Sequence, residues 1–188
     1  MDVAPITYVR HAMPVSQASV HPTEWCLDEA ARSEAAHMAE RLEVAPAIGA
    51  LVTSTEPKAL ETAAVIGAHW GARVVTDDRL REAVRPWIGA GYRGVVHRYL
   101  RGERPEGWEA HEEVSARVAA GVRDAIEAAS GGPVVVVSHG LALTLHLGVR
   151  LGRAFDRESF WSGLTFPDAW CLDAAGTLHR PRAGAASS

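Results

Sequence analysis

The chain has 188 residues, of which 47% are hydrophobic and 22% are charged, and its formal net charge at pH 7 is -4. This length and composition fit one globular domain with a sizeable core and exclude a disordered or fibrous chain. Because acidic residues outnumber basic ones, no global basic field attracts nucleic acid or anionic lipid. We therefore expect neither nucleic acid nor a membrane as a partner, and an anionic substrate must be bound by a local site.

The N-terminus, the apolar stretches and the cysteines bear on the compartment. No apolar stretch approaches the roughly 20 residues that a membrane helix needs. Residues 1–5 contain neither the basic region nor the apolar core of a signal peptide. Cys26 and Cys171 match no metal-binding or redox spacing, which predicts free thiols in a reducing compartment. We expect a cytoplasmic protein; a homo-oligomer is compatible with the sequence without being indicated by it.

Short β-prone runs alternate with longer stretches of helical spacing, which indicates an α/β fold. The runs cover residues 6–9, 50–53, 73–76, 133–137 and 169–172. Consecutive valines at 134–137 predict a central strand that is buried on both faces. After the last run, residues 173–176 predict a hairpin turn and residues 181–188 a frayed tail.

Apolar residues between these runs recur at intervals of three and four, which places them on one face of each predicted helix. These faces carry Leu27, Ala31, Ala35, Met38 and Leu42 in one helix, and Val114, Val118, Val122, Ala125 and Ala129 in another. A further helix is predicted to begin after a cap at Ser54 or Thr55, with Pro57 in its first turn. Its inner face is expected to carry Leu60, Ala63 and Gly67. With no repeat or linker, residues 1–188 are expected to form a single domain.

Two histidines follow predicted strands at the point where each strand ends. The first strand runs into Arg10-His11, and the valine run continues into Ser138-His139-Gly140. In an open parallel sheet the carboxyl ends of the strands form the edge where ligands bind, so both histidines can share one pocket. A lone histidine at a strand end is often an ordinary hydrogen-bonded loop residue, whereas the pair points to a catalytic role.

With three further blocks, these motifs make the chain resemble the histidine phosphatase superfamily, in its Arg-His-Gly phosphatase branch, a group that includes the cofactor-dependent phosphoglycerate mutases. The blocks are Leu27 to Ala31, Ser54 to Ala63 and Leu80-Arg81-Glu82. They follow Arg10-His11 and precede the second histidine motif in the order that the family shows. The resemblance covers nearly the whole chain. It implies a phosphoglycerate mutase-like α/β fold, a three-layer sandwich with a mostly parallel central sheet and helices on both faces.

The resemblance also implies a role for each matched residue. His11 would be the nucleophile that attacks phosphorus and forms a phosphohistidine, which water then hydrolyses. Arg10, Lys58 and a protonated His139 would bind the phosphoryl oxygens. Glu82 would protonate the leaving oxygen and afterwards deprotonate the attacking water. No cofactor and no metal are implied.

Three positions depart from the family pattern. Ala12 replaces the usual glycine and adds a methyl group beside the phosphate. Lys58, the only lysine of the chain, stands where the family has arginine, so it offers a point charge instead of a two-pronged guanidinium. The alternative for Lys58 is an exposed helix residue. Gln17, in the region where many members place asparagine, either binds the phosphoryl group or is a surface loop residue.

The sequence favours hydrolysis over phosphoryl transfer between substrate positions. The chain is short for a mutase, and Leu141 stands where mutases carry a polar asparagine. We therefore expect a phosphatase that hydrolyses a small phosphate monoester through a phosphohistidine on His11. Its partner would be a small phosphorylated metabolite. The alternatives are a phosphoglycerate mutase-type phosphoryl transferase, a phosphohistidine-protein phosphatase and, outside the enzymes, a module that binds a phosphorylated ligand.

Residues 83–111 are predicted to form a cap that covers the pocket and sets specificity. Seven arginines and two glutamates lie between residues 79 and 104, which segregates positive charge there. Arg85 or Arg93 is expected to contact a second anionic group of the substrate. The alternative is a solvated arginine-rich face that pairs with the acidic residues of 106–113. Trp25 is a further candidate for the substrate-binding wall.

Overall fold

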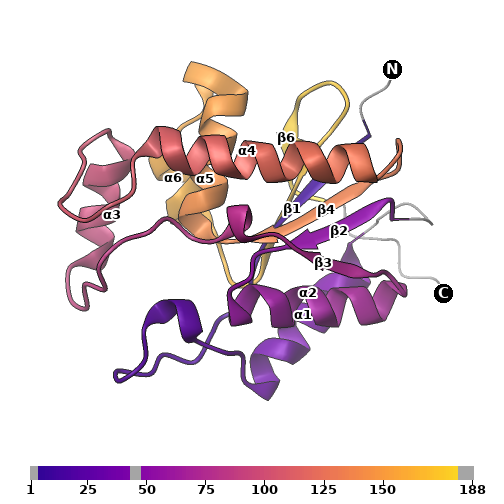
Figure 1. Ribbon diagram of the computed structural model, residues 1–188, viewed down its shortest axis with the longest axis horizontal. Coiled ribbons are helices and arrows are strands. Elements are labelled where there is room, and N and C mark those ends of the chain that lie inside the picture. The colour runs from indigo at the N-terminus through magenta and orange to yellow at the C-terminus, as the bar shows by residue number, and fades with distance from the viewer. Residues whose placement is uncertain (1–3, 43–47, 182–188) are drawn as a thin grey trace.

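A mixed sheet forms the centre of the fold (Figure 1), in a computed structural model that describes residues 4–42 and 48–181. The strands are β1 (Ile6–Arg10), β2 (Ala50–Thr53), β3 (Val74–Thr76), β4 (Val134–Ser138), β5 (Asp168–Leu172) and β6 (Leu178–His179). They lie in the order β3-β2-β4-β1-β5-β6. β1 to β4 run parallel, whereas β5 is antiparallel to both β1 and β6. The predicted, mostly parallel sheet is confirmed.

Helices cover both faces of this sheet. They are α1 (Glu29–Arg41), α2 (Pro57–Trp70), α3 (Tyr92–Leu100), α4 (His111–Ala128), α5 (Gly140–Leu151) and α6 (Arg157–Gly163), with the short 3-10 helices η1 (Pro22–Glu24), η2 (Asp78–Leu80) and η3 (Gly152–Ala154). α1 and α2 lie on one face, and α4 and α5 lie on the other (Figure 1). α6 packs against α5, and α3 packs against α6. The predicted three-layer α/β sandwich is confirmed.

The valines of β4 show how the sheet divides the core. Val135 and Val137 belong to the cluster beneath α1 and α2, whereas Val134 and Val136 belong to the cluster beneath α4 and α5. None of these side chains is more than 1% exposed. Because successive side chains of a strand point to opposite faces, a strand between two helical layers needs an apolar residue at every position. The predicted burial on both faces is confirmed.

The helix α2 differs from its prediction at two points. Its N-cap is Glu56, not Ser54 or Thr55, although Pro57 takes the first turn as expected. Leu60 is 37% exposed instead of facing inward. A helix that begins at Pro57 turns Ala59, Ala63 and Ile66 toward the core. Leu60 lies about 100° around the axis from Ala59 and so leaves this inner face.

β5 and β6 form the hairpin that the turn residues predict. The backbone N–H of Asp173 donates to the carbonyl oxygen of Thr177 at 3.1 Å. Gly176 has a φ of 81°, in the left-handed region that favours glycine. Of the predicted frayed tail, residues 182–188 lie outside the described residues.

Two predictions that bear on the compartment concern the cysteines and the helices. Cys26 and Cys171 are free, as predicted. Within residues 4–42 and 48–181, no helix combines the length and the apolar character needed to cross a membrane.

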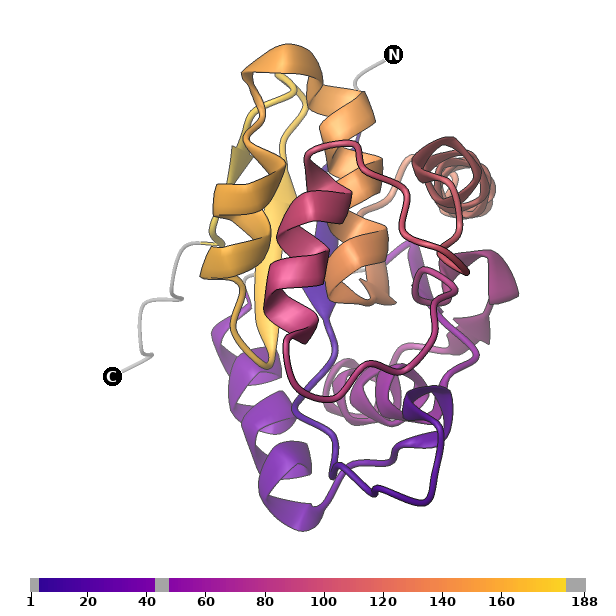
Figure 2. The ribbon, with the colours of Figure 1, turned by 90° about the vertical axis from the view of Figure 1, so that its left-hand side faces the viewer.

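The parallel strands end at one edge of the sheet, which Figure 2 views. α3, drawn in pink, and the segment that leads to it lie in front of the strand ends. The loop after β1, the start of α2 and residues 82–87 contribute side chains to one cavity at this edge. The fold thus brings distant parts of the chain together around this cavity.

Candidate active site

The histidines that follow β1 and β4 lie side by side. Because these strands are parallel neighbours with Arg10 level with Ser138, the next residues, His11 and His139, emerge at the same edge. Their ring centroids are 5.0 Å apart, and both side chains are buried. The structure thus joins the two histidines that the sequence placed at strand ends.

The backbone determines which nitrogen of His11 carries the proton. Nδ1 lies 2.7 Å from the carbonyl oxygen of Ala12, and because a carbonyl only accepts, Nδ1 is the donor. Nε2 of the neutral ring then keeps its lone pair, as a nucleophile requires. Burial and the nearby charge of Lys58 lower the pKa of His11 well below its usual value. At neutral pH this imidazole is therefore uncharged and nucleophilic at Nε2.

Ser54, at the end of β2, holds the second histidine. Nε2 of His139 lies 2.8 Å from Oγ of Ser54, and this oxygen accepts the backbone N–H of Glu56. Nδ1 of His139 is buried and has no hydrogen-bond partner among the described residues. Burial and the neighbouring His11 lower the pKa of His139 well below its usual value. These surroundings favour the neutral form of His139 in the absence of a ligand, and a bound anion beside the ring would favour the protonated form that the resemblance implies.

Arg10 places its guanidinium over an aromatic ring. Its Cζ lies 3.4 Å from the centroid of the Phe166 ring, and Nη1 donates to the carbonyl oxygen of Leu164 at 3.2 Å. Gly140 makes room for it, because a Cβ there would lie 3.3 Å from Cζ of Arg10. Burial lowers the pKa of Arg10 to about 10, so the group stays positively charged at neutral pH. Arg10 lines the cavity beside His11.

Glu82 binds the N-terminus of α5. Its Oε1 accepts the backbone N–H groups of Ala83 and Ala142, both at 2.9 Å, and its Oε2 accepts that of Leu141 at 3.2 Å. The first N–H groups of a helix have no partner inside the helix, and the N-cap His139 supplies no side-chain bond. The carboxylate of Glu82 satisfies two of them, near the positive end of the helix dipole. This arrangement holds a carboxyl group in the same cavity as His11.

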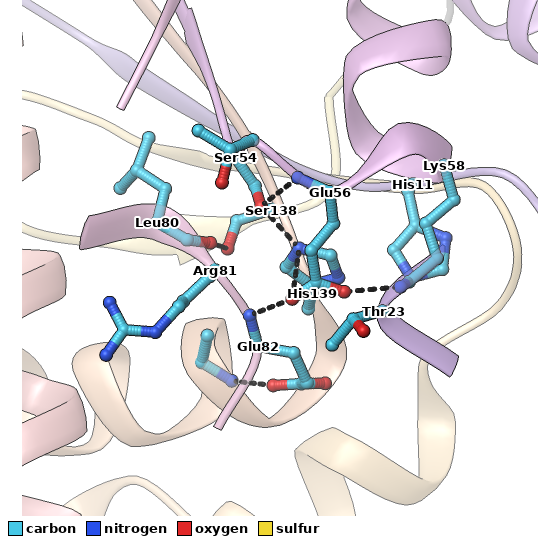
Figure 3. Close-up of polar contacts among 12 residues, drawn as sticks. His11, Thr23, Ser54, Glu56, Lys58, Leu80, Arg81, Glu82, Ser138 and His139 are labelled. Atoms are coloured by element: carbon cyan, nitrogen blue, oxygen red, sulfur yellow. Dashed lines mark hydrogen bonds and ion pairs between the residues drawn. The ribbon is translucent and has the colours of Figure 1, made fainter. Parts of the chain in front are cut away.

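A buried ion pair completes the polar part of the cavity (Figure 3). Lys58 is 6% exposed and Glu56 is 7% exposed. Nζ of Lys58 contacts Oε2 of Glu56 and donates to the carbonyl oxygen of Pro22 at 2.7 Å. Oε1 of Glu56 accepts the backbone N–H of Glu82 at 2.8 Å and lies 3.6 Å from Nε2 of His139. The alternative of an exposed Lys58 is therefore wrong, and its charge is compensated inside the cavity.

Glu56 is a residue that sequence reasoning missed. A signal was present, because this acid stands two residues before the only lysine of the chain, inside the block that resembles a phosphate-binding motif. Residues two apart in a helix do not face each other. Glu56 meets Lys58 because it is the N-cap and has an extended backbone. Phe166 was also missed, since it reaches the site from the loop before β5, where no local pattern marks it.

These side chains line a cavity of about 320 Å³. Its aromatic residues are Trp25, Trp87, Tyr92, Trp161 and Phe166, and its arginine and lysine side chains are Arg10, Lys58 and Arg85. The structure therefore brings Trp25 and Arg85, both expected near the substrate, to the cavity. Cζ of Arg85 lies 5.1 Å from the centroid of the Tyr92 ring, which holds the guanidinium over an aromatic face.

Two expected contacts lie away from the cavity lining. Gln17 is an exposed loop residue, next to Ser16, which does line the cavity. Arg93 is exposed, and its Cζ lies 5.6 Å from the centroid of the Trp161 ring. Other arginines of the segment form surface ion pairs, among them Arg79, Arg81, Arg98 and Arg101. Their partners lie mostly outside residues 106–113, the acidic stretch expected to pair with them.

The methyl group of Ala12 packs into the core. Ala12 is fully buried in a small cluster with Leu27, Ala31 and Ala35. Its backbone N–H donates to Oγ1 of Thr62 at 3.0 Å. The replacement of glycine is therefore accommodated by packing against α1, and Ala12 is not among the residues that line the cavity.

His146 is a core histidine. Its Nε2 lies 3.0 Å from the hydroxyl oxygen of Tyr8, and burial lowers the pKa of His146 to about 4. In the part of the chain that the structure describes, no three histidine, cysteine or acidic side chains are grouped so that they could hold a metal ion.

Solved structures share this fold. Bacillus stearothermophilus YhfR is 22% identical, with a TM-score of 0.74 and 98% of each chain covered. The native structure of a mycobacterial glucosyl-3-phosphoglycerate phosphatase is 21% identical, with a TM-score of 0.74, and the match covers 97% of this chain and 100% of that one. Phosphoglycerate mutase from Bacillus anthracis str. Sterne is 18% identical, with a TM-score of 0.69, over 97% of this chain and 94% of its own. The fold is thus phosphoglycerate mutase-like.

A family model supplies the assignment that these distant structures alone do not. No curated protein sequence matches the chain. The model described as the histidine phosphatase superfamily, branch 1, matches residues 6–162, which contain both histidines, the Glu56–Lys58 pair and Glu82. The chain therefore belongs to branch 1 of the histidine phosphatase superfamily.

Proposed function

We propose that this protein is a phosphatase that hydrolyses a small phosphate monoester through a phosphohistidine on His11. The observation that carries the proposal is the state of the His11 imidazole, which is neutral, protonated at Nδ1 and therefore nucleophilic at Nε2. It lies in a cavity with a fixed cation, Arg10, and a carboxyl group, Glu82. Family membership supports phosphoryl chemistry at this site.

In the first step, Nε2 of His11 attacks phosphorus, and the bond from phosphorus to the ester oxygen breaks. Arg10, whose Nε has no hydrogen-bond partner among the described residues, and Lys58 stabilise the charge on the phosphoryl oxygens. Nδ1 of His139, which has no partner among the described residues, donates a further hydrogen bond. Glu82 in its protonated form gives its proton to the departing oxygen, so the leaving group is released as an alcohol.

In the second step, water attacks the phosphohistidine. Glu82, now ionised, accepts a proton from this water, the bond from nitrogen to phosphorus breaks, and inorganic phosphate leaves. His11 returns to its neutral form. One carboxyl group thus serves both half-reactions, and the bonds that hold Glu82 to the N-terminus of α5 keep it in the cavity throughout.

Hydrolysis fits this chain better than transfer to a second position of the substrate. Leu141, which replaces the polar residue of the mutases, is fully buried in the core and offers the substrate no polar contact. Residues 83–111 supply Ala83, Val84, Arg85, Pro86, Trp87 and Tyr92 to the cavity wall, which supports their role as a specificity cap. The free cysteines support action in the cytoplasm.

The test is phosphate release from a panel of sugar phosphates, phosphoglycerates, nucleotides and an aryl phosphate, with a metal chelator present and with His11→Ala beside the wild type. Release by the wild type that is lost in His11→Ala supports the proposal. Transfer of phosphate between positions of phosphoglycerate with little free phosphate indicates a mutase. Release confined to phosphohistidine proteins indicates the protein phosphatase. Thermal stabilisation by phosphorylated compounds without turnover indicates a binding module.

A further inference from the structure

We propose that the leaving group of the substrate carries an aromatic ring and no second anionic group. This inference rests on the proposed function, because it concerns the part of the same cavity that holds the ester beyond its phosphorus. It is carried by the aromatic wall of the cavity, by the exposure of its rim and by its charges.

Aromatic side chains from separate parts of the chain form the wall. Trp25, after η1, meets Trp87 edge to face, with ring centroids 5.1 Å apart. The ring centroids of Trp87 and Tyr92 are 6.2 Å apart, and those of Tyr92 and Trp161 of α6 are 6.4 Å apart. At the reacting end, the Phe166 ring lies 5.3 Å from that of His11. Rings at these separations offer both faces and edges to another ring.

The rim of the cavity exposes apolar side chains. Trp87 is 48% exposed, Met13 is 55% exposed and Val84 is 52% exposed, and all three line the cavity. Single exposed apolar residues are common, whereas several gathered at the mouth of one cavity mark a surface that a ligand covers. An apolar group bound there would remove this surface from water.

The charges of the cavity leave little for a second anion. Arg10 is beside His11, and Lys58 is paired with Glu56. The remaining cation among the described lining residues, Arg85, lies over the Tyr92 ring. The carboxylate of Glu56 lies in the same cavity and repels an anion. One phosphoryl group uses the available positive charge, so the rest of the substrate is expected to be uncharged.

The volume limits the size of this group. The cavity holds about 320 Å³, near the lower end of the roughly 300–1,000 Å³ of small-molecule sites. This space suits a phosphoryl group with a leaving group of one or two rings. A monoester of an alcohol that carries an aromatic ring is the chemical class that fits the volume of the cavity, its charges and its aromatic wall.

The experiment compares monoesters whose leaving groups are all primary alcohols, so that leaving-group acidity stays similar. Benzyl phosphate is expected to exceed ethyl phosphate in kcat/KM by about 30-fold, because the ring buries apolar surface. It is expected to exceed cyclohexylmethyl phosphate by about fivefold, because ring contacts add to burial. Para-carboxybenzyl phosphate is expected to fall about tenfold below benzyl phosphate. A cyclohexylmethyl or carboxybenzyl ester that equals or exceeds the benzyl ester overturns the proposal.

A substitution at the rim tests the wall itself. Trp87→Ala is expected to lower the ratio of kcat/KM for benzyl over ethyl phosphate by about fivefold. Val149→Ala is the matched control, since Val149 is 63% exposed and does not line the cavity, and its ratio should stay within about twofold of the wild type. An unchanged ratio in Trp87→Ala overturns the proposal.

Binding separates this inference from the proposed function. Benzylphosphonate and ethylphosphonate, which cannot be hydrolysed at the carbon–phosphorus bond, are titrated into the wild type and Trp87→Ala by calorimetry. If no ester is hydrolysed, the proposed function fails. Binding of benzylphosphonate about tenfold more tightly than ethylphosphonate, and reduced in Trp87→Ala, still supports the aromatic subsite. Equal binding of the two phosphonates overturns it.

Discussion

Replacing Glu56 by glutamine removes the carboxylate that compensates Lys58 inside the cavity. Glutamine keeps the size of the side chain and an acceptor for the backbone N–H of Glu82, so the change is mainly one of charge. Removing one partner of a buried ion pair costs about 3–5 kcal/mol. We expect about 3 kcal/mol, the lower value, because the carbonyl oxygen of Pro22 still accepts from Nζ of Lys58. For a domain of this size, the melting temperature should then fall by about 6–12 °C.

The same substitution is expected to tighten the binding of inorganic phosphate. Oε1 of Glu56 lies 3.6 Å from Nε2 of His139. Nδ1 lies on the other side of the imidazole from Nε2. A phosphoryl group that accepts a hydrogen bond from Nδ1 would therefore lie about 8 Å from this carboxylate, which is the distance to Nε2 plus the width of the ring and one hydrogen-bond length. At that distance, two like unit charges repel by about 2 kcal/mol for an effective dielectric constant of about 20. Loss of this repulsion should lower the dissociation constant for phosphate by at least about tenfold.

The assay is thermal unfolding of the wild type and Glu56→Gln at increasing phosphate concentration. Glu56→Gln should melt lower without phosphate and should gain more from each addition of phosphate. Glu61→Gln is the matched control, because Glu61 lies in α2, the helix that Glu56 caps, and pairs with Arg32 at 2.7 Å outside the cavity lining. Its response to phosphate should equal that of the wild type. A Glu56→Gln variant that is as stable as the wild type, or that binds phosphate no more tightly, refutes the reasoning.

The histidines and Lys58 lead to three more expectations. The pKa of His146 is about 4 in the folded chain and about 6.5 when unfolded, so the unfolded state binds the proton more readily and stability falls as pH drops from 6.5 toward 4. Chemical denaturation should show that, over this pH range, the free energy of unfolding falls by about 3 kcal/mol less in His146→Gln than in the wild type. An equal fall in both proteins speaks against this expectation. Because the pKa of His11 is well below 6.5, the acid limb of the kcat/KM profile should lie below pH 6.5, and a half-maximal rate at or above that pH contradicts the assignment. Lys58→Met should lower kcat/KM at least about 100-fold, because it leaves Glu56 unpaired. Adding Glu56→Gln to this variant should recover part of the lost activity. A double variant that is no more active than Lys58→Met contradicts this expectation.

The edge of the sheet that carries the site could be predicted from local sequence patterns. The valine run of β4 and the short apolar run of β1 are strong strand signals, and each ends directly before a histidine. Parallel pairing then places His11 and His139 together, since neighbouring strands end at one edge. Periodicity also located α1 and α4, whose apolar faces are continuous over several turns.

Features that depend on tertiary packing could not be predicted. Strand β6 spans only Leu178–His179, so no β-prone run marks its bounds, although the turn before it indicates the hairpin that brings it against β5. The exposure of Leu60 depends on where α2 begins, which the choice of N-cap decides. The lowered pKa of His139 follows from burial and neighbouring groups, which a sequence pattern does not reveal.

The cavity wall shows the same limit. Arg85 and Trp25 could be nominated because their segments flank the motif residues, and both line the cavity. Arg93 is the second residue of α3, and its guanidinium lies over the Trp161 ring instead. Whether an arginine of this segment reaches the cavity depends on the path of the backbone, and composition alone does not determine that path.

Trapping the covalent intermediate tests the central claim most directly. The wild type is mixed with substrate, quenched in alkali within the first turnover and digested, and the peptides are analysed by mass spectrometry. We predict a phosphoryl group on the peptide that contains His11, at the imidazole, with no such group in His11→Ala and no phosphate release by that variant. Single-turnover hydrolysis without any phosphoenzyme, or phosphate release by His11→Ala at the wild-type rate, would contradict the account.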